Sequence, residues 1–288
     1  MDNLTLRVQG GNYMRDHKGL KDIARNIRKD IVSMIHTSKS GHPGGSLSAV
    51  EILTALYFDE MNIDPNNCKM EDRDRFVLSK GHAAPVLYAT LAHKGYFDRD
   101  ELNGLRKINR MLQGHPDMKG TPGVDMSTGS LGQGFSVACG MAMASKLDNA
   151  PWRVYTLLGD GEVQEGIVWE AAMSAAHYKL DNMVAFLDYN GLQIDGKNED
   201  VMNIGPIVDK FKAFGWNVIE IDGHDFDQIF AALDMAKETV GKPTMIVAKT
   251  IKGKGISFME NEAGWHGAAP SDNDLEIALA DLGGVDND

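Results

Sequence analysis

Two residues of this sequence, Asp160 and Asn190, are suited to bind a metal ion that carries a diphosphate. Asp160 lies between Gly159 and Gly161, and Asn190 follows thirty residues later. Glycine lets the backbone approach a diphosphate closely, because it has no Cβ and can hold φ angles that other residues avoid. The Asp160 carboxylate, the Asn190 amide oxygen and a nearby backbone carbonyl are hard oxygen ligands of the kind that Mg²⁺ or Ca²⁺ prefers. The pattern predicts a metal and diphosphate site, although a lone Gly-Asp-Gly would also fit an ordinary turn.

A strand, a helix and a second strand must position these two residues. Apolar runs at 154–158 and 183–188 come just before Asp160 and Asn190, and residues 166–179 between them repeat apolar side chains at helical spacing. Ligands of open parallel sheets bind outside the carboxyl ends of the strands. Both residues would emerge at that edge, which agrees with the predicted site.

The rest of the chain alternates helical and extended patterns in the same way. Such alternation predicts an α/β fold with a doubly wound, mostly parallel sheet and helices on both faces. Ser48 and Glu51 form the pattern of a capping box at a helix start, and Arg25, Arg28 and Lys29 fit the solvated face of an amphipathic helix. The predicted strands are 76–78, 154–158, 183–188, 217–221 and 244–248, and helices are predicted near 20–34, 166–178, 206–214 and 226–237.

Composition agrees with a large domain in the cytoplasm. The 288 residues can bury a substantial core, and we expect one domain over residues 1–270 with an acidic tail over 271–288. The net charge of −12 argues against a nucleic-acid surface. Cys68 and Cys139 offer no disulfide framework and are expected to be structural. The sequence shows no signal peptide and no apolar run of membrane-spanning length, so no membrane partner is expected.

Four histidines each adjoin a glycine in a loop-like segment. Loops that a rigid sheet positions are where binding groups concentrate. A neutral imidazole can donate through one nitrogen and accept through the other, and it can move protons near neutral pH. These histidines are therefore candidates for contacts with hydroxyls or with a diphosphate. The candidates are His42, His82, His115 and His266, whereas His17, His36, His93, His177 and His224 are expected to be structural.

Two other glycine-rich segments do not fit established phosphate-binding motifs. Residues 252–257 lack the spacing of a P-loop. Residues 132–134 lack the third glycine of a dinucleotide fingerprint, since Val137 stands in its place. Residues 129–134 more simply allow close backbone approach to a ligand at a helix start, where free amides favour an anion. A nicotinamide enzyme is therefore not expected.

The glycine and histidine motifs, in their order along the chain, resemble the amino-terminal, diphosphate-binding domain of transketolases. The resemblance covers about residues 18–270, nearly the whole chain. Transketolases move a two-carbon ketol unit between sugar phosphates with thiamine diphosphate. The resemblance therefore implies that cofactor, a bound Mg²⁺ or Ca²⁺, and sugar-phosphate substrates. The motifs that carry it are residues 41–45, 79–83, 114–117, 128–134, 159–166, 190–196 and 264–267.

The resemblance also implies roles for individual residues. Ser130 stands where many transketolases have proline, and Gly191 lies in the segment leading to Leu192, so the loops depart from the family pattern at these points. Glu165 is expected to be a catalytic residue, since it matches an acid that in the family contacts a glutamate of the opposite domain, although a first-turn glutamate would also suit a helix dipole. The implied metal ligands are Asp160, Asn190 and the carbonyl of Leu192. The implied cofactor contacts are His82, Gly161, Asn190 and His266 on the diphosphate side, and Gly129, Ser130 and Leu131 behind the thiamine. The implied proton-transfer or hydroxyl-binding residues are His42, His115 and His266.

The family's second cofactor-binding domain is missing from this sequence. In transketolases that domain carries the glutamate that activates the cofactor's aminopyrimidine, and it holds most of the residues that grip sugar phosphates. The resemblance therefore implies a split transketolase, in which a separately encoded carboxy-terminal subunit completes the site. A two-fold symmetric heterotetramer with two chains of each kind would follow.

Two other functions stay open at this point. The α subunit of a thiamine-dependent 2-oxoacid dehydrogenase shares the metal site and a partner-supplied glutamate, although the Gly-His pattern suits a polyhydroxylated substrate better. A noncatalytic binding protein that kept the fold is the second, although the intact Asp160, Asn190 and four candidate histidines argue against it.

Overall fold

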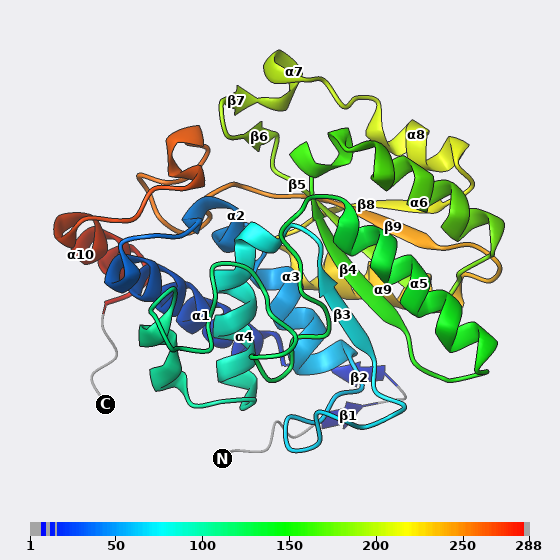
Figure 1. Ribbon diagram of the computed structural model, residues 1–288, viewed down its shortest axis with the longest axis horizontal. Coiled ribbons are helices and arrows are strands. Elements are labelled where there is room, and N and C mark those ends of the chain that lie inside the picture. The colour runs from blue at the N-terminus through cyan, green and yellow to red at the C-terminus, as the bar shows by residue number, and fades with distance from the viewer. Residues whose placement is uncertain (1–6, 10–11, 15, 285–288) are drawn as a thin grey trace.

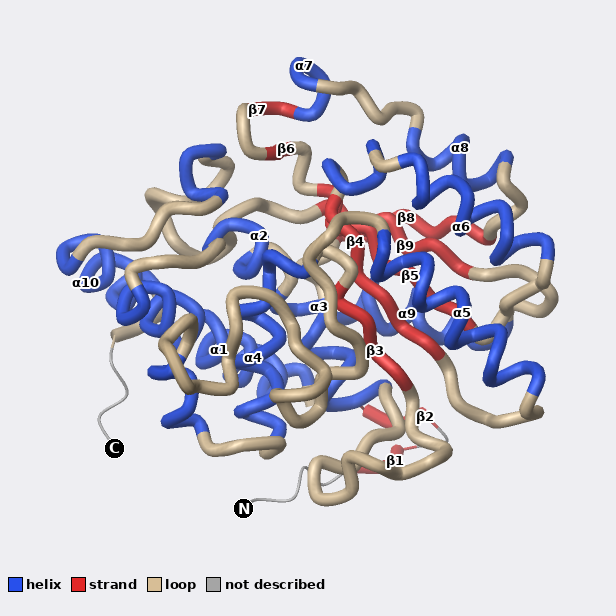
Figure 2. Tube along the Cα trace, in the orientation of Figure 1, coloured by secondary structure: helices blue, strands red, loops and turns tan. Residues whose placement is uncertain are grey.

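The apolar runs of the sequence form the strands of one parallel sheet in the computed structural model, which describes residues 7–9, 12–14 and 16–284 (Figure 1). The strand order is β3-β4-β5-β9-β8, and each neighbouring pair is parallel. Helices lie on both sides of this sheet (Figure 2). The predicted α/β fold with a doubly wound, mostly parallel sheet is confirmed.

The helices and strands have the following bounds. The strands are β1 Arg7–Gln9, β2 Asn12–Met14, β3 Arg75–Leu78, β4 Val154–Gly159, β5 Met183–Tyr189, β6 Leu192–Gln193, β7 Gly196–Lys197, β8 Asn217–Asp222 and β9 Thr244–Lys249. The α-helices are α1 His17–Ser38, α2 Pro43–Leu47, α3 Val50–Ala55, α4 Ala84–Lys94, α5 Gln133–Leu147, α6 Gly166–His177, α7 Asn198–Val201, α8 Ile207–Ala213, α9 Phe226–Glu238 and α10 Asp272–Asp281. Short 3₁₀ helices span Gly81–Ala83, Arg99–Gly104, Gly161–Gln164 and Ala263–His266, and a π-helical turn spans Leu56–Glu60.

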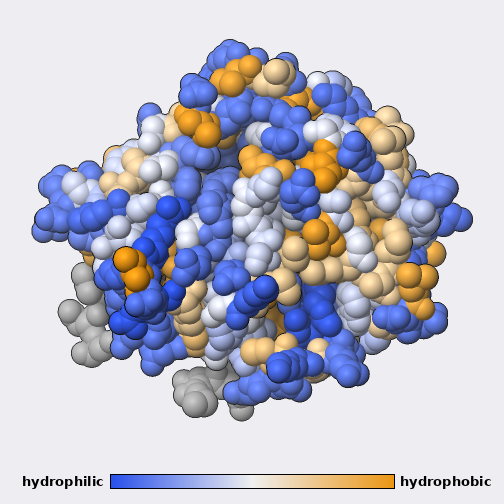
Figure 3. All heavy atoms as spheres, in the orientation of Figure 1, coloured by the Kyte–Doolittle hydropathy of each residue, from blue (hydrophilic) through white to orange (hydrophobic). Residues whose placement is uncertain are grey.

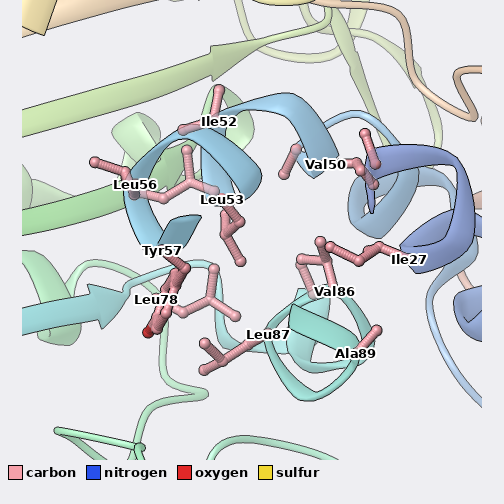
Figure 4. Close-up of a cluster of buried hydrophobic side chains, with 14 of the residues drawn as sticks. Ile27, Val50, Ile52, Leu53, Leu56, Tyr57, Leu78, Val86, Leu87 and Ala89 are labelled. Carbon is pink, nitrogen blue, oxygen red and sulfur yellow. The ribbon is translucent and has the colours of Figure 1, made fainter. Parts of the chain in front are cut away.

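Two buried clusters hold the layers together, because alternate residues of a strand point to opposite faces of a sheet. On one face, Tyr155 and Phe186 pack with side chains from α1, α3, α4 and α9. Figure 4 shows part of this cluster, in which Ile27 of α1 points toward Val86 of α4. On the other face, Leu158 packs with side chains from α5, α6 and α8. Each fully buried aliphatic or aromatic side chain contributes about 1.5–3 kcal/mol to stability.

The pairing of β4 with β5 brings the predicted site residues to one edge. Gly159, the last residue of β4, is paired with Asp188 of β5. Asp160 follows directly after β4, and Asn190 follows directly after β5. Both residues therefore leave the sheet at its carboxyl edge, at adjacent positions.

The basic cluster of α1 is only partly solvated, which corrects the prediction from helical spacing. Arg25 is exposed, but Arg28 and Lys29 are each only 6% exposed. Both terminal nitrogens of Arg28 lie 2.7 Å from oxygens of Glu51, and Glu51 also lies 2.9 Å from Nδ1 of His224. Burial alone would raise the pKa of Glu51, but Arg28 and His224 lower it to about 2. A bidentate ion pair of this kind compensates the charge of a buried guanidinium. Helical spacing alone does not reveal that the arginine has such a partner.

The capping box predicted at Ser48 and Glu51 is wrong. Ser48 ends α2, and α3 begins at Val50 with Ala49 as its N-cap. The Ser48 hydroxyl donates to Asp188 at 2.6 Å, so it stabilises a buried carboxylate instead of a helix start. Ser-x-x-Glu fits a capping box only where a helix begins at that serine.

The acidic segment after residue 270 forms a helix over most of its described length. Ser271 and Asp274 make a true capping box that starts α10. Ala278 and Leu282 of this segment belong to the same buried cluster as α1. The expected tail over 271–288 is thus structured as far as residue 284, and residues 285–288 lie outside the described residues.

Both cysteines are free, and burial raises the pKa of Cys139 to about 12, which suits the structural role predicted for it.

Within the described part of the chain, no helix combines the length and the apolar character that crossing a membrane requires.

Candidate active site

The carboxyl edge of the sheet holds Asp160 in a buried, amide-lined position. Asp160 is 2% exposed. One of its carboxylate oxygens accepts from the backbone amide of Gly161 at 2.8 Å, and the other accepts from that of Gly191 at 2.5 Å. Gly191 has φ +79°, a left-handed conformation that glycine adopts without strain. Gly191, where the sequence departs from the family pattern, therefore forms a turn without strain, and in this turn its backbone amide donates to the Asp160 carboxylate.

Asn190, at the end of β5, contacts a second buried carboxylate, that of Asp188. Its amide nitrogen donates to Asp188 at 3.3 Å, and its amide oxygen accepts from the backbone of Leu192 at 3.1 Å. These two bonds fix which end of the amide is the oxygen. The oxygen keeps a second lone pair for a metal ion.

The charges around Asp160 call for a cation with oxygen ligands. Burial, together with the nearby Asp188 carboxylate, raises the pKa of Asp160 to about 6. No group of three or more His, Cys, Asp or Glu side chains converges as a metal cage among the described residues. A carboxylate, an amide oxygen and a backbone carbonyl form instead an incomplete hard-oxygen set, of the type that Mg²⁺ completes with phosphate oxygens and water. Asp160, Asn190 and Leu192 fit a metal-diphosphate group.

Three of the four candidate histidines form a triangle beside this edge. The ring centroids are 5.4 Å apart for His42 and His82, 5.5 Å for His42 and His266, and 5.2 Å for His82 and His266. These residues come from the start of α2, the turn before α4 and the 3₁₀ helix after β9. The sheet thus brings together side chains that are more than 200 residues apart along the chain.

Burial is the main cause of the low pKa values in this triangle. It lowers the pKa of His42 and of His266 to about 4, and that of His82 well below its usual range. The positive charges of Lys80 and Lys252 act in the same direction. All three imidazoles are therefore neutral near pH 7, the form that can both donate and accept a hydrogen bond.

We expect the free energy of unfolding to fall as the pH is lowered from about 6.5 to about 4. The folded histidines have depressed pKa values, so in this window the unfolded chain takes up protons that the folded chain does not. Urea unfolding at pH 7 and pH 5 measures the effect, and His82→Asn should make the pH dependence shallower. His177→Asn, at an exposed position of α6, is the matched control and should leave it unchanged. An equal pH dependence in His82→Asn and the parent chain would contradict this prediction.

His115, the fourth candidate, packs against the loop before α5. A Cβ on Gly129 would lie 3.1 Å from its ring, so the loop approaches this histidine closely. Burial and the Arg106 guanidinium both lower the pKa of His115, and Arg106 also lowers that of His42. Arg106 donates to Ser40 at 3.2 Å, which holds it on the His42 side.

The predicted thiamine-backing loop, residues 129–131, is tied to the end of β4 by a residue that sequence reasoning missed. Glu162 is 2% exposed, and it accepts from the amides of Gly132 at 2.8 Å and Gly159 at 3.0 Å. The Ser79 hydroxyl also donates to Glu162. Ser130 and Glu165 are both exposed, and Glu165 is the N-cap of α6. Glu165 is thus open to a partner, as its predicted interface role requires.

Two buried lysines complete the site, and sequence reasoning missed both. Lys80 pairs with Asp188 and donates to the Gly45 carbonyl at 2.6 Å. Lys252 lies 3.3 Å from the Leu192 carbonyl and 3.0 Å from Nδ1 of His266. Burial lowers the pKa of Lys252 to about 8. The available signal was that each lysine directly precedes a glycine, Lys80 within the motif at residues 79–83 and Lys252 within the glycine-rich segment 252–257.

Comparison with known proteins identifies the family. Residues 20–287 match the family described as "Transketolase, thiamine diphosphate binding domain". The 6-deoxy-6-sulfo-D-fructose transketolase subunit SqwG of Clostridium sp. (strain MSTE9) is 49% identical over 263 residues, which cover 91% of this chain and 96% of that protein. An apulose-4-phosphate transketolase subunit of Phocaeicola vulgatus is 44% identical over 255 residues, with 88% and 90% covered. This chain belongs to the thiamine diphosphate binding domain family of transketolases.

Undivided transketolases match over only part of their length. The crystal structure of transketolase from Campylobacter jejuni superposes with a TM-score of 0.89 at 34% identity, covering 94% of this chain and 43% of that one. Human transketolase is 43% identical, with 92% of this chain and 42% of that protein covered. The chain therefore spans less than half of these enzymes, but nearly all of the two subunits named above. The family resemblance predicted from the sequence is confirmed, and the dehydrogenase and noncatalytic alternatives are not favoured.

Proposed function

We propose that this chain is the amino-terminal subunit of a split transketolase, which transfers a two-carbon ketol unit from a ketose to an aldose together with a carboxy-terminal subunit. The observation that carries the proposal is that Asp160 and Asn190 follow neighbouring parallel strands, and that Lys252 contacts both the Leu192 carbonyl and His266 of the histidine triangle. A metal-diphosphate group and a hydroxyl-rich substrate both find suitable partners there.

The cofactor of the proposed enzyme is thiamine diphosphate with Mg²⁺, or Ca²⁺ in its place. Asp160, Asn190 and the Leu192 carbonyl would hold the metal, and Gly161 would let the backbone approach the diphosphate. His82 and His266 would contact the diphosphate side, and residues 129–131 would back the thiamine. When bound, the cofactor supplies the carbon nucleophile of ketol transfer.

The side chains of this subunit would orient the sugars and move protons. His42 and His266 are neutral near pH 7, so each can donate to one substrate oxygen and accept from another. Lys252 can only donate when charged, so its contact makes Nδ1 of His266 an acceptor and leaves the proton on Nε2. That tautomer presents a donor for substrate or diphosphate. His115 would serve the same purpose for hydroxyls.

The partner subunit would bring the activating glutamate, and Glu165 would meet it at the interface. Apolar side chains gather over the face that α5 and α6 form (Figure 3), including the exposed Leu147, Met173 and Tyr178. A surface of this composition suits a permanent subunit contact. We infer a heterotetramer with two chains of each kind, located in the cytoplasm where sugar phosphates are metabolised.

The donor sugar of the proposed enzyme is a ketose with an anionic end group. Pentose phosphates of the pentose phosphate pathway are the first donors to test. The names of the two subunit relatives add 6-deoxy-6-sulfo-D-fructose and apulose 4-phosphate as second candidates.

The test is ketol transfer to ribose 5-phosphate by this chain alone, by a carboxy-terminal subunit encoded beside it, and by their mixture. Each of the donors named above is supplied in turn, with thiamine diphosphate and Mg²⁺. Transfer by the mixture alone is the expected result. Recruitment of a lipoyl-bearing acyltransferase instead of sugar turnover would favour the dehydrogenase, and lack of cofactor binding in every sample would overturn the site.

A further inference from the structure

A buried amide on the segment after Asn190 has bonding capacity that the protein does not use. Asn198, the first residue of α7, is 4% exposed. Neither its amide oxygen nor its amide nitrogen has a hydrogen-bond partner among the described residues. Buried polar side-chain atoms are usually bonded, and each one left unpaired costs about 1–3 kcal/mol. Two such atoms in one side chain indicate a ligand.

Asn198 lies next to the predicted metal ligands. It lines a cavity of about 480 Å³ together with Asn190, Gly191 and Leu192. Its backbone amide donates to the Gly191 carbonyl at 2.9 Å, which fixes α7 to the loop that binds Asp160. The Asn198 amide nitrogen faces the Asp160 carboxylate and lowers the pKa of that carboxyl in the way a side-chain hydrogen bond does, against the larger effect of burial, although the contact falls short of full hydrogen-bond geometry.

Gln193 approaches the same point from β6. Its amide nitrogen is buried and has no hydrogen-bond partner in the described part of the chain. A Cβ added to Gly161 would lie 3.3 Å from Cβ of Gln193 and 3.9 Å from the amide oxygen of Asn198. Both side chains therefore converge on Gly161, where the diphosphate is proposed to meet the backbone.

We propose that Asn198 and Gln193 are outer ligands of the metal-diphosphate group. The inference rests on the proposed function and deepens it. Mg²⁺ keeps several of its waters, and those waters must donate their hydrogens to acceptors. The Asn198 amide oxygen would accept hydrogen bonds from the waters of the metal, and the buried amide nitrogen of Gln193 would donate to the diphosphate.

Amides suit this place better than carboxylates. Asp160 and Asp188 already put two acidic groups at the edge, where burial, and after it the charge of Asp188, raises the pKa of Asp160. A third carboxylate would add repulsion, both to these groups and to the diphosphate. An amide binds water and phosphate oxygens without adding charge.

The test replaces Asn198 with leucine and measures Mn²⁺ binding by electron paramagnetic resonance, in the presence of thiamine diphosphate. It uses both the purified full chain and its complex with the carboxy-terminal subunit. Loss of an outer-shell partner weakens metal binding by about 10–100-fold. We expect that loss in Asn198→Leu, with an unchanged or higher melting temperature of the cofactor-free protein, because the unpaired amide is removed.

Glu199→Leu is the matched control, since Glu199 is the next residue and lines the same cavity but is exposed. It should keep the parental Mn²⁺ affinity. Gln193→Leu provides a second variant in case Asn198→Leu fails to fold, and it should weaken binding of thiamine diphosphate at saturating Mn²⁺. Affinities within twofold of the parent in the folded variants would overturn the inference, as would an equal loss in Glu199→Leu. Failure of the parent chain and its complex to bind Mn²⁺ and cofactor would instead overturn the proposed function.

Discussion

Replacing Asp160 with asparagine is expected to abolish the metal-dependent binding of thiamine diphosphate. The substitution replaces the single anionic ligand of the proposed set with a neutral amide, so only neutral oxygens remain, from residue 160, Asn190 and Leu192. We expect at least a hundredfold weaker affinity for the cofactor with Mg²⁺, about 2.7 kcal/mol or more, and no ketol transfer by the mixed subunits. Isothermal titration calorimetry measures the affinity.

The same substitution should not destabilise the cofactor-free protein. Asp160 is buried beside Asp188, and its pKa of about 6 reflects the cost of charge at that place. A neutral amide removes that cost but can accept from only one of the backbone amides of Gly161 and Gly191, so the two effects oppose each other and the melting temperature should change little while binding is lost. Asp195→Asn, at an exposed residue of the neighbouring turn, is the control and should change neither quantity. Normal cofactor affinity in Asp160→Asn would refute the metal ligand assignment.

The arrangement of the fold was predictable because its signals are local. The runs at 154–158 and 183–188 became β4 and β5, and the pattern between them became α6. Parallel neighbours end at one edge of the sheet, so the closeness of Asp160 and Asn190 followed from order along the chain. The histidine triangle was anticipated as a set of candidates, but its geometry was not, because it depends on how three distant loops pack.

The missed residues are those whose role depends on a partner far away in sequence. Arg28 is buried because Glu51 and His224 meet it, and Ser48 serves Asp188 instead of a helix end. Lys252 lies in a segment that lacks P-loop spacing, yet its side-chain nitrogen contacts His266. Charge and motif spacing describe one segment at a time, whereas a buried ion pair is a property of two segments. Such residues become visible only in the folded chain.

The buried pair of Lys80 and Asp188 should make a large contribution to stability. Lys80 is 2% exposed and Asp188 is fully buried, and the lysine offsets the burial that would otherwise raise the pKa of Asp188. In Lys80→Met the carboxylate loses its countercharge, so we expect a cost of about 3–5 kcal/mol in the free energy of unfolding. Urea unfolding at pH 7 measures it.

Neutralising the second member of the pair should recover much of this loss. In Lys80→Met/Asp188→Asn no buried charge remains at the pair, and Ser48 and Thr250 still offer hydroxyls to the amide. The double variant should therefore be more stable than Lys80→Met, with a coupling energy of about 0.5–3 kcal/mol in a double-mutant cycle. Lys249→Met, which breaks the exposed pair with Glu220, is the control and should cost at most about 1 kcal/mol. If the double variant is less stable than Lys80→Met, the Asp188 carboxylate is held by the hydroxyls of Ser48 and Thr250 without need of the lysine charge, which would contradict this prediction.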